Sequence, residues 1–152
     1  MSTTTRPSSS SDLKHTTLSL PVPTVLPTST LHLHLTYYPT HTPSSPPSLL
    51  LFITTTPLTS SPSQSSPMGS FVYAIPSSLL NTNNKTILTT PLYTVPSNID
   101  LTNRVATALA HKLGAPVWVG CSVDFGFGGQ DVGEMDVLRG VLAAVGAEEE
   151  GK

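Results

Sequence analysis

Apolar side chains recur along the chain with two different periods, and the stretch from Ser97 to Asp124 contains one segment of each kind. In its first half the apolar residues follow the i, i+4, i+7, i+8 spacing of one helical face, and they are Leu101, Val105, Ala108 and Leu109. Side chains that can accept from the free N–H groups of a helix start are Ser97, Asn98 and Asp100. Gly114, followed by Pro116, ends the helix that this pattern predicts.

The second half of the stretch has a period of two, which is the period of a β-strand. One side of this strand consists of Val117, Val119, Cys121 and Val123, and the other of Trp118, Gly120, Ser122 and Asp124. A turn of Gly, Ala and Pro joins the strand to the preceding helix. We expect the helix to pack on the side of the valines, so that Trp118 faces the other way.

Four earlier segments have strand character, and one later segment has helix character. The strands are predicted at 29–38, 49–55, 69–75 and 86–93, from alternation or from continuous apolar runs such as LLLFI. The second helix is predicted to start at a capping box formed by Asp131 and Glu134 and to end at Gly146. Its apolar stripe is expected to consist of Met135, Leu138, Leu142 and Val145.

The element order is therefore β-β-β-β-α-β-α, and the predicted fold class is α+β. Consecutive strands joined by loops favour hairpins, so we expect a mainly antiparallel β-sheet with two helices on one face. A single α+β domain is expected at 29–146, with flexible loops at 39–48 and 56–67. A disordered Ser/Thr/Pro-rich tail is expected at 1–28, and an acidic tail at 147–152.

Composition narrows the classes of function. The 152 residues include 15 prolines, and charged residues make up 11 %, against ~25 % in ordinary globular chains. A net charge of -2 with scattered Lys and Arg disfavours nucleic acid and anionic membranes as partners. Cys121 is the only cysteine, so a disulfide within the chain is impossible, and we expect a reducing compartment, the cytoplasm or the nucleus.

Three groups of residues approach a known chemistry, and each lacks part of it. The segment from Gly120 to Asp124 resembles the G-x-S-x-G motif of serine hydrolases, but the last glycine of the motif is missing and Ser122 lies within a strand. His111 could be imagined as the general base, yet the spacing of the sequence provides no acidic residue to orient it. Cys121 is expected to be a core side chain, because no electropositive setting for a reactive thiol is visible. The glycine-rich turn at 126–129 lacks the third glycine of the dinucleotide-binding motif G-x-G-x-x-G, and it lacks the Lys-Ser/Thr pair of a P-loop.

His32 and His34 share one face of a predicted strand and could form half of a metal site. The other ligands would have to come from His15 or His41, in segments expected to be disordered, whereas structural zinc needs four ligands. The residues therefore predict no metal, no cofactor and no enzyme. They predict a small sheet-and-helix domain with one uncovered apolar face.

Several blocks of sequence carry a resemblance to a known family: LHLHLTYY, MGSFVYAIP, TPLYTVPSNIDLTNRVATALAHKLGAPVWVGCSV and EMDVLRGVLAAV. The most specific are SFVYAIP, TPLY and the run that starts at Arg104. From Leu31 to Val145 the chain resembles fungal members of the proteasome assembly chaperone 4 family. The resemblance implies a non-enzymatic α+β protein that forms a heterodimer with a homologous chaperone 3-like subunit. It also implies that this heterodimer promotes assembly of the 20S proteasome α-ring and docks around the α5 subunit.

The interface for such a partner is predicted on the sheet face that the helices leave uncovered. We place Trp118, Val72, Phe52 and Ser122 in it, because an exposed apolar patch of this kind usually marks an interface. Two other hypotheses stay open: an interaction subunit of another cytosolic complex with a longin-like or roadblock-like fold, and a hydrolase that uses Ser122. Co-purification with proteasome α subunits would separate the first from the chaperone, and Ser122→Ala would test the second.

Overall fold

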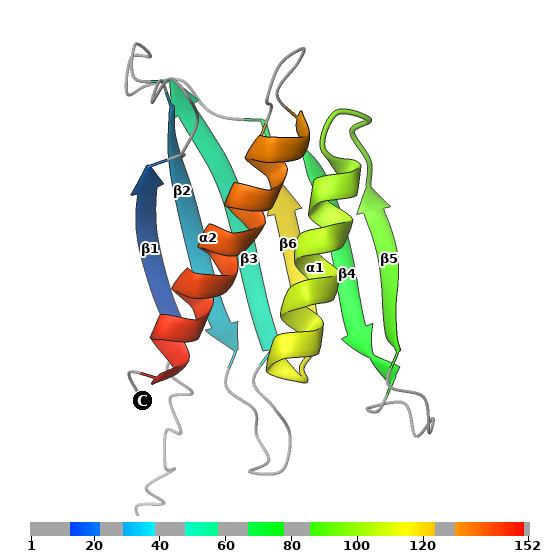
Figure 1. Cartoon of the computed structure of the whole chain (residues 1–152). Coiled ribbons are helices and arrows are strands. Elements are labelled where there is room, and N and C mark those ends of the chain that lie inside the picture. Colours follow the sequence, from blue (N-terminus) through cyan, green and yellow to red (C-terminus); the bar gives the residue numbers. More distant parts are fainter. Residues whose placement is uncertain are drawn as a thin grey trace, which may run out of the picture.

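Six strands and two helices make up the described part of the chain, residues 13–21, 29–38, 48–57, 67–77, 86–123 and 130–150 of a computed structural model (Figure 1). In chain order the elements are β1 (Lys14–Pro21), β2 (Ser29–Tyr38), β3 (Ser48–Pro57), β4 (Ser70–Pro76), β5 (Ile87–Tyr93), α1 (Ile99–Leu113), β6 (Val117–Cys121) and α2 (Gln130–Glu150). The predicted α+β class is confirmed, with one more strand at the start than the predicted order contained. The expected loops at 39–48 and 56–67 lie mostly outside the described residues, while Ser48 and residues 56–57 belong to β3.

The first strand corrects the prediction of a disordered segment at 1–28. Residues Lys14–Pro21 form β1, which pairs antiparallel with β2, and Leu18 and Leu20 lie opposite Leu33 and Leu31. These two leucines pack against the hydrophobic core. Apolar and polar residues do alternate in the segment HTTLSLP, but its Thr and Ser residues and the flanking prolines resemble a solvated tail in composition. Pairing with the edge of β2 is what places the two leucines against the core.

The sheet order is β1-β2-β3-β6-β4-β5, and the last strand in the chain occupies its middle. β6 runs parallel to β3 and antiparallel to β4, and every other neighbouring pair is antiparallel. β5 and β6 both run antiparallel to β4, one on each side of it. The chain must therefore cross over between them, and α1 makes that crossover because strands of the same direction cannot be joined by a tight turn.

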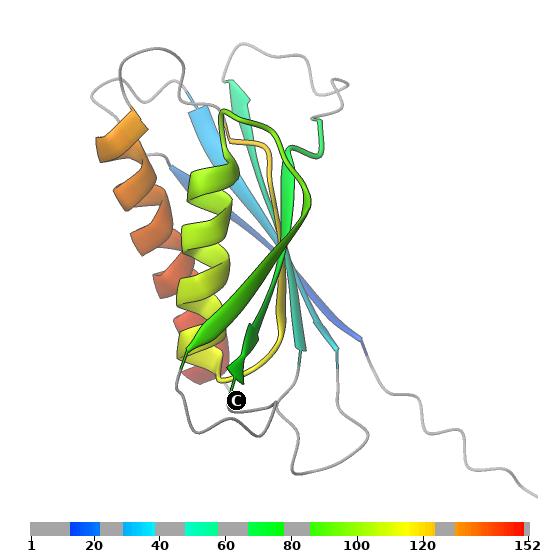
Figure 2. The same cartoon turned by 90° about the vertical axis from the view of Figure 1, so that its right-hand side faces the viewer.

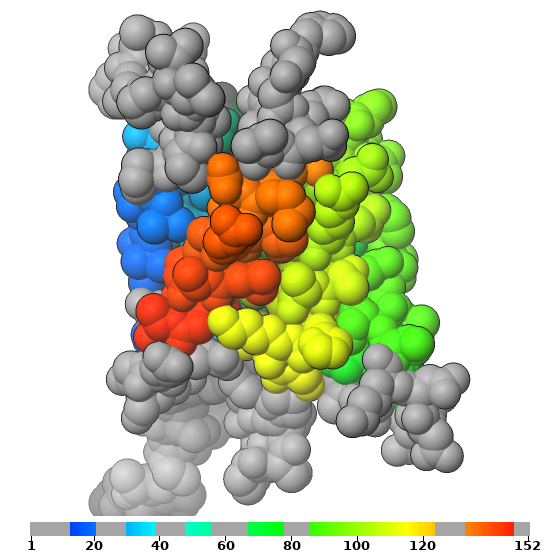
Figure 3. Space-filling view, viewed as in Figure 1, coloured from blue at the N-terminus to red at the C-terminus, as the bar shows by residue number. Residues whose placement is uncertain are grey.

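Both helices lie on the same face of the sheet, as the element order predicts, and Figure 2 shows them together on one side of it. Side by side they cover the sheet's central strands (Figure 3). Alternate residues of β2, β3, β4 and β6 point to this helix-covered face and are fully buried, among them Leu33, Leu51 and Val119. In the predicted stripe of α1, Leu101, Val105 and Leu109 are fully buried, whereas Ala108 is only partly buried.

The two ends of α1 are secured in different ways. Gly114 adopts the left-handed conformation with φ 60°, and its N–H donates to the Ala110 carbonyl, as a glycine after a helix often does. At the other end Asn98 precedes the helix but makes no side-chain cap, contrary to the prediction. Its Oδ1 accepts instead from the backbone N–H of Ser70 at 3.1 Å and from the Ser70 hydroxyl at 2.6 Å. This buried pair fastens the start of α1 to the start of β4.

The second helix is longer than predicted and is turned differently. It runs through Gly146 to Glu150, so residues 147–150 are helical rather than a separate tail. Gly146 does not end the helix, and a Cβ at this position would meet only the flexible end of the Lys112 side chain. The buried stripe is Val137, Val141 and Val145, and of the predicted stripe only Val145 belongs to it.

Replacement of Leu109 by Ala should lower the free energy of unfolding by ~2–5 kcal/mol, the usual cost of emptying a buried leucine site. Leu109 is fully buried between α1 and the sheet. The matched control is His111→Ala on the exposed side of the same helix, which should cost less than about 0.5 kcal/mol. Urea denaturation of both variants measures the difference, and equal losses would show that α1 does not pack on Leu109.

Deletion of residues 1–27 should lower the free energy of unfolding by about 1–3 kcal/mol, because it removes the apolar area that Leu18 and Leu20 bury and exposes the edge of β2. The double variant Leu18→Ala/Leu20→Ala keeps the strand and should lose most of the same amount. A truncated chain that melts at the same urea concentration as the full chain would show that β1 contributes nothing to stability.

Candidate functional site

The sheet face opposite the helices is covered by no element of the described residues (Figure 2). Strand alternation sends every second side chain of all six strands to this open face. In β4 and β6 the inward residues are fully buried while Phe71, Tyr73 and Trp118 are only half-buried. The side chains of the open face thus pack mainly on one another and not under another element of the described residues.

Trp118 lies on the open face, as the sequence predicts, and the sheet order places its strand between β3 and β4. The strand register places it between Leu50 of β3 and Tyr73 of β4. Its ring centroid lies 4.9 Å from that of Tyr73, in a tilted arrangement, and 6.5 Å from that of Tyr38, edge to face. Aromatic pairs at such separations attract each other beyond the effect of buried area alone. The indole is therefore held in place before any partner arrives.

Gly120 brings two further aromatic rings together. Phe52 of β3 and Phe71 of β4 lie opposite Gly120 on its two sides, and their rings stack with centroids 5.9 Å apart and planes 7° apart. A Cβ on Gly120 would stand 2.4 Å from Phe52 Cδ1, so only glycine lets the rings meet across β6. We call the resulting surface the aromatic patch; it consists of Leu50, Phe52, Phe71, Tyr73 and Trp118, and its rim of Tyr38, Leu88 and Tyr93.

Three of the four predicted interface residues share this face, and one does not. Trp118 and Phe52 lie within the aromatic patch, and Ser122 follows β6 on the same side, with its N–H donating to the Ile53 carbonyl at 2.9 Å. Val72 is fully buried on the helix-covered face, where it pairs in register with Val119. Including it in the interface was wrong, because the apolar run FVYAI conceals which residues face out. The outward residues missed by the prediction are Phe71 and Tyr73.

A polar band flanks the aromatic patch on the side of β1 and β2. We call it the histidine band; its members are His15, Thr17, Ser19, His32, His34 and Thr36. The imidazoles of His15 and His34 stack with centroids 6.2 Å apart. Within the part of the chain that the structure describes, no three potential ligands are grouped so as to hold a metal ion. The sequence does not reveal that His15 lies on a paired strand, because the composition of its segment is typical of a solvated tail.

The described residues do not assemble a nucleophile with a base. Ser122 lies on the open face, while His111 is an exposed residue of α1 on the opposite side of the sheet. Cys121 is fully buried, and this burial raises the pKa of its thiol to about 11, although hydrogen bonds from Val123 and Thr102 lower it in part. A thiol of that pKa is protonated at neutral pH and is a poor nucleophile. The expectation that Cys121 is a core side chain is confirmed.

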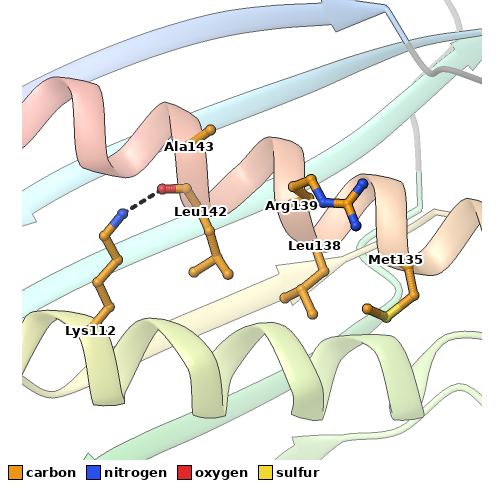
Figure 4. A pocket seen from close by; sticks show the side chains of 6 residues that line it. All are labelled: Lys112, Met135, Leu138, Arg139, Leu142 and Ala143. Atoms are coloured by element: carbon orange, nitrogen blue, oxygen red, sulfur yellow. Dashed lines mark hydrogen bonds between the residues drawn. The ribbon is translucent and has the colours of Figure 1, made fainter.

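A shallow groove of about 400 Å³ runs between the two helices on the other side of the molecule (Figure 4). Its lining consists of Lys112, Met135, Leu138, Arg139, Leu142 and Ala143. Lys112 reaches across it to donate to the Leu142 carbonyl at 2.7 Å. This hydrogen bond links α1 to α2, and it explains the position of Lys112 without any bound ligand.

A membrane-spanning segment is not found among the described helices, since neither α1 nor α2 combines the required length with sufficient apolar character.

Comparison with known proteins places this fold and face in a family. A search of curated proteins finds no match. Among solved structures, a chain from the crystal structure of a novel chaperone complex for yeast 20S proteasome assembly has the same fold, with a TM-score of 0.56 and 20 % sequence identity. The similarity covers 88 % of this chain and 97 % of the other. The sequence model of the family described as proteasome assembly chaperone 4 matches residues 30–123, from the second strand to the end of the central one. This match spans more than half of the chain, which therefore belongs to the proteasome assembly chaperone 4 family.

Proposed function

We propose that this protein is one subunit of a proteasome assembly chaperone and that its open sheet face binds a homologous chaperone 3-like subunit. The single observation that supports this most directly is the aromatic patch. Its side chains are fixed by one another, yet no described element of the chain covers them. Large aromatic groups in such a position are the usual anchors of protein interfaces.

The geometry of the open face favours another sheet as the occupant. Two sheets pack face to face at ~10 Å with their side chains interdigitating, and the broad face that the six described strands form suits this kind of packing. A homologous subunit would present a sheet of the same width. The solved chain with this fold also comes from a chaperone complex.

The further steps of the proposal follow from the family and go beyond the fold. The heterodimer promotes assembly of the α-ring of the 20S proteasome and docks on α subunits, with α5 as the expected contact. It works without a cofactor and without catalysis, in the cytoplasm or the nucleus. Affinity purification of the tagged protein from its native cells, followed by mass spectrometry, tests this: the chaperone 3-like subunit and α subunits should be enriched. Enrichment of an unrelated complex in their place would contradict the proposal.

Trp118→Ala should weaken the heterodimer about thirtyfold or more, the equivalent of ~2 kcal/mol, because it removes the central anchor of the aromatic patch. The isolated subunit should lose less stability than that, since Trp118 is only half-buried in it. Isothermal titration against the chaperone 3-like subunit and urea denaturation of each subunit alone provide the two quantities.

The matched control for this titration is Met135→Ala. Met135 is 49 % exposed on α2, on the far side of the sheet, and its loss should leave the affinity unchanged. An unaltered affinity of Trp118→Ala, or an equal effect of both substitutions, would overturn the assignment of the open face as the interface.

A further inference from the structure

The apolar character of the open face continues to one edge of the described sheet and stops before the other. The sheet order puts β5 at the first of these edges and β1 at the second. On β5, Leu88 lies opposite Ile75 and Tyr93 lies opposite Phe71, so both point to the open face with these residues of β4. Leu88 is 48 % exposed and Tyr93 is 54 % exposed, more than their neighbours on β4. The most exposed side chains of the aromatic patch and its rim therefore lie on an edge strand.

Proline protects the outer edge of β5 but not its face. Hydrogen bonds between antiparallel strands alternate along the pair. Counted from Ser77, whose N–H donates to the Thr86 carbonyl at 2.8 Å, a residue opposite Val72 directs its backbone away from β4. That residue is Pro91, which has no N–H and so opposes the addition of another strand along this edge. A partner of β5 is therefore expected to approach its apolar face and not its edge.

The strands at the other side of the open face present polar groups that already contact one another. Ser19 Oγ lies 3.0 Å from His32 Nδ1, and Thr17 Oγ1 lies 3.3 Å from His34 Nδ1. Covering such groups with apolar side chains would remove their contact with water, which is unfavourable. Protein interfaces accordingly have an apolar centre and a polar rim that stays accessible to water. The histidine band has the character of a rim.

We propose that the partner's sheet is displaced toward β5, so that it covers the aromatic patch and its rim on β5 and leaves the histidine band in contact with water. We call the covered area the footprint. This inference rests on the proposed function, because it locates the partner subunit on the open face. The footprint extends over β3, β6, β4 and β5, and its two middle strands carry Trp118 and Tyr73, whose rings lie 4.9 Å apart. Residues that contribute most to binding cluster near the centre of an interface. The partner implied presents aliphatic or aromatic side chains above β4 and β5.

Thr90 and Thr17 provide a matched pair of positions for the test. Thr90 lies opposite Tyr73 on β5, and Thr17 lies opposite His34 on β1. Both are exposed residues of an edge strand, and both point to the open face. Replacement by arginine adds the same bulk and charge at either position, but only Thr90 lies inside the footprint.

Thr90→Arg should raise the dissociation constant for the chaperone 3-like subunit at least about thirtyfold, because the added charge would have to lose its water under the partner. Thr17→Arg should change it less than about threefold, as expected of a substitution outside the footprint. Isothermal titration of the full chain measures both. Urea denaturation of each variant alone establishes that it is folded.

The double variant Leu88→Ala/Tyr93→Ala separates the loss of apolar contact from steric exclusion, because it adds neither bulk nor charge. It should weaken binding about tenfold or more if the partner covers these side chains. Because both side chains are largely exposed in the separate subunit, its urea midpoint should stay close to that of the wild type.

The results distinguish the footprint from the heterodimer itself. Equal losses with both arginine variants would overturn the displaced footprint and show that the partner covers the whole open face. A loss with Thr17→Arg alone, or full affinity of Thr90→Arg or of the double alanine variant, would also overturn it and leave the heterodimer standing. Absence of binding by the folded wild-type chain would overturn the proposed heterodimer and the footprint with it.

Discussion

The central strand β6 has to serve two faces of the sheet at once, and the rest of the structure depends on how it does so. Its inward residues, Val117, Val119 and Cys121, complete the core under α1. Its outward residues, Trp118 and Gly120, organise the aromatic patch. Trp118 packs against Tyr73, and Gly120 has no side chain and so leaves room for the rings of Phe52 and Phe71 to stack. Because β6 joins β3 to β4, it also joins the two halves of the sheet. A change in this strand therefore affects the core and the aromatic patch together.

The open face combines two surfaces with different roles. The aromatic patch presents apolar area, while the histidine band presents imidazole and hydroxyl groups that hydrogen-bond to one another. The described Asp, Glu and Arg residues lie on the helices and not on this face, which lowers the cost of covering it because buried charges are expensive to desolvate. All the described ion pairs, Arg104 with Glu134 and Arg139 with Asp136, lie on the helices. The domain thus has a wet, charged side and a side suited to another protein.

Two residues show how local rules can be right in kind and wrong in place. Glycine commonly ends a helix, and Gly114 does so, yet α2 continues through Gly146 to Glu150. Asparagine commonly caps a helix, and Asn98 stands at the cap position, yet its amide oxygen is bound by Ser70 of a strand far away in sequence. In the case of Asn98 a tertiary contact replaces the local one, because it satisfies buried polar groups that would otherwise be left unpaired.

The sequence by itself determined the kinds and positions of most elements, because periods of two and near 3.6 record which side chains must be buried together. It also determined that Trp118 points away from the helices, since parity along β6 allows nothing else. Only the tertiary structure decided that β6 enters between β3 and β4, that Lys14–Pro21 is a strand, and that Phe71 and Tyr73 face out while Val72 faces in. These facts depend on pairing between distant segments, and an apolar run such as FVYAI has no polar face to reveal its orientation until its neighbours fix the register.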